Sequence, residues 1–94
     1  MLAEVLKVGQ LVYSRAGRDR GRPFLIWQVC SDRRVYMVDG SLRTTAKPKL
    51  KNIIHIQAAK AIDTEIAERL SRGEKVTDAE IRQAISRLTA TQGT

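Results

Sequence analysis

Residues 15–23 form a basic segment, RAGRDRGRP, whose residue types suit the binding of phosphate groups. Four arginines and two glycines fall within this segment. The arginine side chain offers a planar fork of N–H donors that matches phosphate oxygens, and glycine lets the backbone turn and approach a ligand closely. The segment therefore predicts a loop that contacts a polyanion, with a solvated surface loop as the alternative.

The net charge of the chain is concentrated in its first part. Residues 1–57 hold eleven Lys and Arg against four Asp and Glu, whereas residues 58–94 hold six of each sign. The first part thus carries the whole formal charge of +7. This excess predicts a polyanionic partner, of which nucleic acid is the commonest, although a basic face that only keeps the protein in solution would have the same charge. No basic amphipathic helix carries these charges, which argues against a membrane surface as the partner.

Size and composition indicate one small cytoplasmic domain. The chain has 94 residues, of which 43% are hydrophobic, as in proteins that fold. No apolar run approaches the roughly 20 residues that span a bilayer, and the first residues lack the features of a signal peptide. The single cysteine, Cys30, cannot form an internal disulfide and is expected to be a small buried side chain. We therefore expect a cytoplasmic protein that is monomeric when free.

No pattern in the sequence indicates an enzyme, a metal site or a bound cofactor. His55 is the only histidine and has no cysteine near it in the sequence, so a zinc site has little support. The chain offers no paired carboxylates and no nucleophile motif. Gly17 and Gly21 lie between two predicted strands and do not open a helix, as the glycines of a nucleotide-binding motif would. We therefore predict a binding protein in which His55 is a partly exposed strand residue.

The basic segment lies between two predicted strands of a small β-barrel. Short runs rich in β-branched and aromatic residues, bounded by turn-forming residues, predict strands. Asp39-Gly40 predicts a tight reversal of the chain, and Pro48 excludes residues 46–52 from the interior of a sheet. Residues 24–30 are apolar at almost every position, so both faces of that strand should be covered. The predicted strands are residues 11–14, 24–30, 35–38, 41–45 and 53–57.

From Ala58 the spacing of apolar residues changes to the helical period. Ile62, Ile66 and Leu70 fall on one face of a predicted helix, which Gly73 is placed to end. The sequence therefore divides into a basic barrel at residues 1–57 and a neutral C-terminal hairpin of two helices at residues 58–94.

The second helix has a clear start signal. Thr77 and Glu80 have the spacing of a capping box, and Val76 and Ile81 flank it in the positions of a hydrophobic staple. Residues 89–94 are small and polar and are expected to fray. Covering the apolar strand at residues 24–30 with this hairpin would stabilise a barrel that is small on its own.

The few aromatic residues all fall on predicted strands. Phe24 and Trp27 are expected in the core, whereas Tyr13 and Tyr36 are equally suited to packing and to stacking on an RNA base. With so little stacking surface, the sequence favours recognition of folded RNA through its backbone and shape.

Three segments of the first part resemble a KOW domain. VGQLVYSRAGRDRGR at residues 8–22 is similar to the KOW motif, with Gly17 at the central glycine, and the match continues through VDGSLR and KPKLKN. Over residues 5–57, and more weakly at residues 73–81, the chain resembles the bacterial KOW-domain RNA-binding proteins. These proteins in turn resemble a KOW-domain ribosomal protein of the archaeal and eukaryotic large subunit.

The resemblance implies an SH3-like β-barrel that binds RNA, chiefly ribosomal RNA of the large subunit, with a neighbouring ribosomal or translation protein as a further partner. The alternative is a protein-interaction adaptor of the translation or transcription machinery, in which Tyr13 and Tyr36 would form an aromatic groove. The RNA-binding residues implied, the loop glycines included, are Arg15, Gly17, Arg18, Arg20, Gly21, Arg22, Arg43, Lys47, Lys49 and Lys51.

Overall fold

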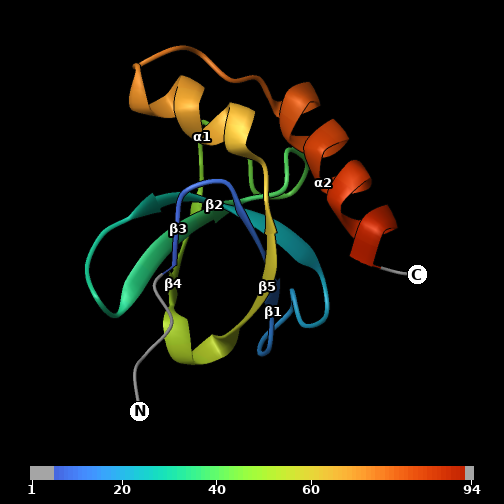
Figure 1. Ribbon diagram of the computed structural model, residues 1–94. Helices are drawn as coiled ribbons and strands as arrows, with labels where there is room; N and C mark the ends of the chain where they lie inside the picture. Colours follow the sequence, from blue (N-terminus) through green and yellow to red (C-terminus); the bar gives the residue numbers. More distant parts are fainter. Residues whose placement is uncertain (1–5, 93–94) are drawn as a thin grey trace.

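The protein is a curved five-stranded antiparallel sheet with two helices on one side (Figure 1). This computed structural model describes residues 6–92. The strand order is β4-β3-β2-β1-β5, and a one-turn 3₁₀ helix, η1, joins β4 to β5. The prediction of a mainly β domain with a helical tail is confirmed. The elements are β1 (Gln10–Ser14), β2 (Pro23–Val29), β3 (Arg34–Val38), β4 (Lys49–Asn52), η1 (Ile53–His55), β5 (Ile56–Ile62), α1 (Thr64–Ser71) and α2 (Asp78–Gln92).

Both faces of the sheet are covered by apolar side chains. One face carries the sheet cluster, whose buried members are Val12, Phe24, Ile26, Val35, Met37 and Ile56. The other face carries the helix cluster, whose buried members are Leu11, Leu25, Val38, Ile66, Val76, Ile81, Ala84 and Ile85. Successive residues of a strand point to opposite faces, so the apolar run of β2 supplies Phe24 and Ile26 to one cluster and Leu25 to the other. The prediction that both faces of the run at residues 24–30 are covered is confirmed for residues 24–27, whereas Gln28, Val29 and Cys30 are exposed.

The sheet curves until the edge strand β4 approaches the segment that follows β1. Lys51 Nζ in β4 donates a hydrogen bond to the carbonyl of Ala16 at 3.2 Å, although β3 and β2 separate these strands in the sheet. η1 forms one backbone hydrogen bond to the turn before β3 and another to the segment after β1. The amide of Ile53 donates to the carbonyl of Arg33 at 2.8 Å, and the amide of Arg15 donates to the carbonyl of His55 at 2.7 Å.

The predicted strand at residues 41–45 does not form. The chain does reverse at Asp39-Gly40, where Gly40 has φ +78°. However, Asp39 Oδ1 accepts hydrogen bonds from the amides of Ser41 and Arg43 at 2.9 and 2.8 Å, which holds these residues in a turn. The strand that pairs with β3 is instead β4, at an edge of the sheet. That placement agrees with the exclusion of residues 46–52 from the sheet interior.

The first helix begins later than predicted. Ala58 and Ile62 belong to β5, where they pair with Val12 and Gln10 of β1, and the pairing with β1 overrides the helical spacing of this segment. α1 starts after Asp63, whose Oδ1 accepts a hydrogen bond from the amide of Ile66 at 3.0 Å. The change from strand to helix that was expected at Ala58 therefore falls inside a strand.

Two single-residue expectations are also corrected. His55 is exposed, as predicted, but it ends η1 and does not lie on a strand. Cys30 is exposed, because it follows β2 at the start of the turn to β3 and no element covers it.

The predicted capping box at the start of α2 is confirmed. The amide of Thr77 donates to Glu80 Oε1 at 2.9 Å, and the amide of Glu80 donates to Thr77 Oγ1 at 3.2 Å. Val76 and Ile81 are both buried in the helix cluster. The helix continues through Thr89 to Gln92, the segment where fraying is expected, and residues 93–94 lie outside the described residues.

The carboxylate of Glu80 links the two helices and gives a prediction about acid stability. Its pKa is lowered to about 2, first by the hydrogen bond from Arg69 and then by the hydrogen bond from the amide of Thr77. A carboxyl group whose pKa is lower in the folded state stabilises the fold above its unfolded pKa, and this contribution is lost as the pH falls through the folded pKa.

We therefore expect the Tm of the protein to fall between about pH 5 and pH 2, and to fall less in the Glu80→Gln variant. The glutamine amide oxygen still accepts from the amide of Thr77 but does not titrate. Circular dichroism melts at the two pH values measure the difference. An equal fall in both proteins would show that the Arg69–Glu80 pair does not contribute to stability.

Candidate nucleic-acid interface

The loop between β1 and β2, residues 15–22, is held in a defined conformation by its own backbone. The amide of Gly21 donates to the carbonyl of Ser14 at 2.8 Å, and the amide of Arg22 donates to the carbonyl of Asp19 at 2.9 Å. Gly17 and Gly21 have φ values of +76° and +83°, which glycine adopts without strain. The glycines thus permit a compact loop that presents its arginines from fixed backbone positions.

A buried carboxylate fastens this loop to the next one. Asp19 is only 4% exposed, and its Oδ2 accepts hydrogen bonds from Nε and Nη2 of Arg43 at 3.1 and 2.9 Å. The ion pair joins the loop at residues 15–22 to the turn at residues 39–43. Arg43 therefore lies beside the predicted RNA-binding loop, but part of its guanidinium is occupied by Asp19, and its evident role is to position the loop.

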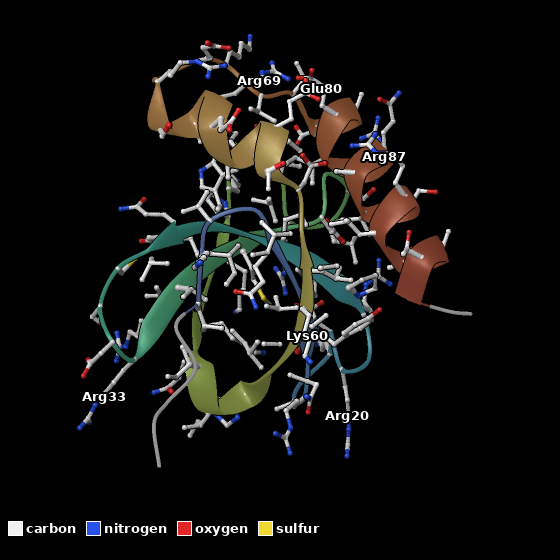
Figure 2. All side chains as sticks on the ribbon, in the orientation of Figure 1. Arg20, Arg33, Lys60, Arg69, Glu80 and Arg87 are labelled. Atoms are coloured by element: carbon white, nitrogen blue, oxygen red, sulfur yellow. The ribbon has the colours of Figure 1, made fainter. Side chains whose placement is uncertain are left out.

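Three arginines of the loop have side chains without a hydrogen-bond or ion-pair partner among the described residues. Arg15, Arg18 and Arg20 are exposed, and within the described part of the chain their side chains form no hydrogen bond or ion pair. Arg20 extends from the loop away from the two helices (Figure 2). Arg22 is half-exposed, and its Nη2 lies 3.6 Å from Asp39 Oδ2. These side chains keep most of their N–H donors available for a ligand.

A second basic segment, residues 47–51, meets this loop through β4. Lys51 Nζ reaches the carbonyl of Ala16, and Lys49 lies on the same face of β4 by the alternation of the strand. Their cross-strand partners Val35 and Met37 belong to the sheet cluster, so the lysine stems lie beside apolar residues while their ammonium groups reach the surface. Lys47 differs, because it is exposed in the turn before β4 and its side chain makes no hydrogen bond to the described part of loop 15–22.

The structure brings two further basic residues to the interface beyond those that the sequence implies. Arg33 is exposed in the turn between β2 and β3, and Arg34 is exposed at the start of β3. Figure 2 shows Arg33 extending, like Arg20, away from the helices. η1 connects this turn to the loop through the bonds Ile53–Arg33 and Arg15–His55. The adjacent arginines were visible in the sequence, but their link to the loop depends on the curvature of the sheet.

Two apolar side chains are also prominent beside the loop. Ile54 in η1 is 70% exposed, and Leu42 in the turn that holds Arg43 is 62% exposed. Each belongs to a segment bonded to the loop, through His55 and through Arg43. The sequence gives no signal that places either residue at the interface, because their exposure arises only in the folded chain.

The cations of the helices are mostly paired, in contrast to those of the loop. Arg69 bonds to Glu80 at 2.6 Å, and Arg72 bonds to Glu74 at 2.6 Å. The pKa values of both arginines are raised, first of all by these side-chain hydrogen bonds. Arg87 likewise bonds to Asp63 at 2.7 Å. Positive charge without a carboxylate partner is therefore concentrated on the sheet and its loops.

The described residues contain no group of three or more His, Cys, Asp and Glu side chains placed to hold a metal ion. None of the helices in residues 6–92 has the length and apolar character needed to cross a membrane.

No protein-family model matches the sequence, and neither does any curated protein. The candidate interface is therefore defined by the geometry and charge of residues 15–22, 33–34, 43 and 49–51.

Proposed function

We propose that the chain is an RNA-binding module that associates with the ribosome in the cytoplasm, with ribosomal RNA of the large subunit as its partner. The observation that carries this proposal is the ordered loop at residues 15–22. It presents Arg15, Arg18 and Arg20 without carboxylate partners and lies against Lys51. Arginine and lysine at fixed, closely spaced positions bind successive phosphates, which supply most of the affinity for a nucleic acid.

We also propose that the sheet is an SH3-like β-barrel of the KOW type. Five short antiparallel strands in the order β4-β3-β2-β1-β5, with the 3₁₀ helix η1 between β4 and β5, support this fold. The contact between Lys51 and Ala16 supports the curvature that a barrel needs. Gly17, which the resemblance places at the centre of the KOW motif, has φ +76°, a conformation that favours glycine.

Recognition through the RNA backbone fits the placement of the aromatic residues. Phe24 is fully buried, and Tyr13 and Trp27 are partly buried against the helix cluster. Little aromatic surface remains for stacking a series of bases, as single-strand binding proteins do. The exposed arginines are better suited to the phosphates of a folded RNA.

The alternative function, a protein-interaction adaptor, has less support. It requires Tyr13 and Tyr36 to form an exposed aromatic groove, but Tyr13 packs against the helix cluster and Tyr36 is partly buried. The charge distribution instead favours a polyanion.

Co-sedimentation of the purified protein with ribosomal subunits over a salt series tests the proposal. If about four to six cations meet phosphates, log K should fall with log salt with a slope of about −3 to −5. A protein that does not sediment with subunits, and binds no RNA even at low salt, would contradict it.

A further inference from the structure

A pocket of about 230 Å³ lies where the loop at residues 15–22 enters β2, between the turn at residues 39–43 and helix α2. Pro23 and Ile85 supply apolar surface to its lining. Arg22 belongs both to this pocket and to the loop of the candidate interface. The pocket therefore adjoins the candidate interface at Arg22.

One carboxylate oxygen in the pocket is open to a donor from a ligand. Asp39 is 8% exposed, and its Oδ1 accepts from the amides of Ser41 and Arg43. Among residues 6–92, its Oδ2 has only Arg22 Nη2 as a polar partner, at 3.6 Å, which is too far for a hydrogen bond. The hydroxyls of Ser41 and Ser86 also line the pocket and form no hydrogen bond to the described residues. The lining thus offers a strong acceptor beside two groups that can donate or accept.

Two guanidinium groups stand at the same pocket. Arg82 Nη1 donates to the carbonyl of Gly40 at 2.5 Å, which fixes the side chain of this α2 residue and leaves most of its five N–H donors free. Arg22, at the end of the loop at residues 15–22, supplies the second guanidinium group. An apolar surface, one carboxylate acceptor and two cations match the parts of a nucleotide, namely a base face, an amino group and the adjoining phosphates.

We propose that this pocket binds one unpaired nucleotide of the RNA, with its base amino group donating to Asp39 Oδ2 and its phosphates bound by Arg22 and Arg82. The inference rests on the proposed RNA-binding function and extends it to α2. Adenine, cytosine and guanine each carry an exocyclic amine. Uracil does not, and its N3–H lies between two carbonyl oxygens that the carboxylate repels. The site therefore discriminates against uracil, and the electrically neutral C-terminal part takes part in RNA recognition.

Fluorescence anisotropy with 5′-labelled oligo(C) and oligo(U) of equal length tests this preference. We expect the protein to bind oligo(C) roughly fivefold or more tightly, because a hydrogen bond that specifies a base gives a discrimination of this order. Ser86 is exposed on α2, so Ser86→Phe should fill the pocket without disturbing the core. This variant should lose the preference and keep the salt-dependent binding of the loop.

Ala90→Phe places the same side chain at an exposed position of α2 outside the pocket lining, and it should keep the preference. Circular dichroism establishes that both variants are folded. Equal binding of the two oligonucleotides by the unmodified protein, or a preference that survives Ser86→Phe in a folded protein, would overturn the inference while the proposed function stands. Absence of binding to either oligonucleotide and to ribosomal subunits would overturn the proposed function itself.

Discussion

Replacing Gly40 with alanine is expected to lower the free energy of unfolding by about 3–4 kcal/mol. Gly40 has φ +78°, and a side chain in that conformation costs roughly 1–2 kcal/mol. In addition, a Cβ atom at this position would overlap the backbone oxygen of Asp78 and approach the side chain of Arg82. The obstacle is the first turn of α2, so either the helix or the turn at residues 39–43 must move.

That movement would break contacts that fix α2 on the sheet. Arg82 donates to the carbonyl of Gly40, and the amide of Thr45 donates to Asp78 Oδ1 at 2.8 Å. Ile81 and Ile85 of the same helix belong to the helix cluster. A shift of the helix therefore also weakens apolar packing, which is why the expected loss exceeds the backbone cost alone.

Gly21→Ala is the matched control for this prediction. Gly21 has φ +83°, almost the same conformation, but nothing lies within 4 Å of a Cβ atom placed there. Its replacement should cost only the backbone part, roughly 1–2 kcal/mol. Urea denaturation of the two variants measures the difference, and equal losses would show that the close approach of Gly40 to α2 is unimportant. Because small domains have a total stability of about 5–15 kcal/mol, Gly40→Ala should also be visibly less resistant to heat.

The features that the sequence predicted well are those whose cause is local. The apolar run of residues 24–30 requires partners on both faces of a strand, and the structure supplies the sheet cluster and the helix cluster over residues 24–27. The capping box at Thr77 and Glu80 depends on residues three apart in the chain, and both of its hydrogen bonds form. The reversal at Asp39-Gly40 likewise follows from the conformational freedom of one glycine.

The features that the sequence did not predict depend on contacts between distant segments. Residues 58–62 have helical spacing, but their pairing with β1 keeps them in a strand. Arg43 resembled a free basic residue, whereas 24 positions separate it in the chain from its carboxylate partner Asp19. The same is true of the candidate site as a whole: its arginines could be found in the sequence, but the contact between Lys51 and Ala16 arises only when the sheet curves.

The double variant Arg18→Ala/Arg20→Ala should bind RNA more weakly by about tenfold or more at moderate salt. Both side chains are exposed and form no hydrogen bond within the described part of the chain, so their removal deletes ligand contacts and leaves the loop intact. The backbone bonds of Gly21 and Arg22, which hold the loop, do not involve these side chains. Thermal unfolding should therefore be nearly unchanged while affinity for ribosomal RNA falls.

The salt dependence of binding distinguishes direct phosphate contacts from long-range electrostatic attraction. Each lost phosphate contact reduces the slope of log K against log salt by about 0.7–0.9, so the double variant should lose about 1.4–1.8. Arg72→Ala/Lys75→Ala removes the same charge from the link between α1 and α2, on the far side of the molecule from the loop (Figure 1). That control variant lowers only the long-range electrostatic attraction, so it should keep nearly the full slope of log K against log salt. If both double variants reduced the slope equally, net charge would account for the binding and the loop would have no special role.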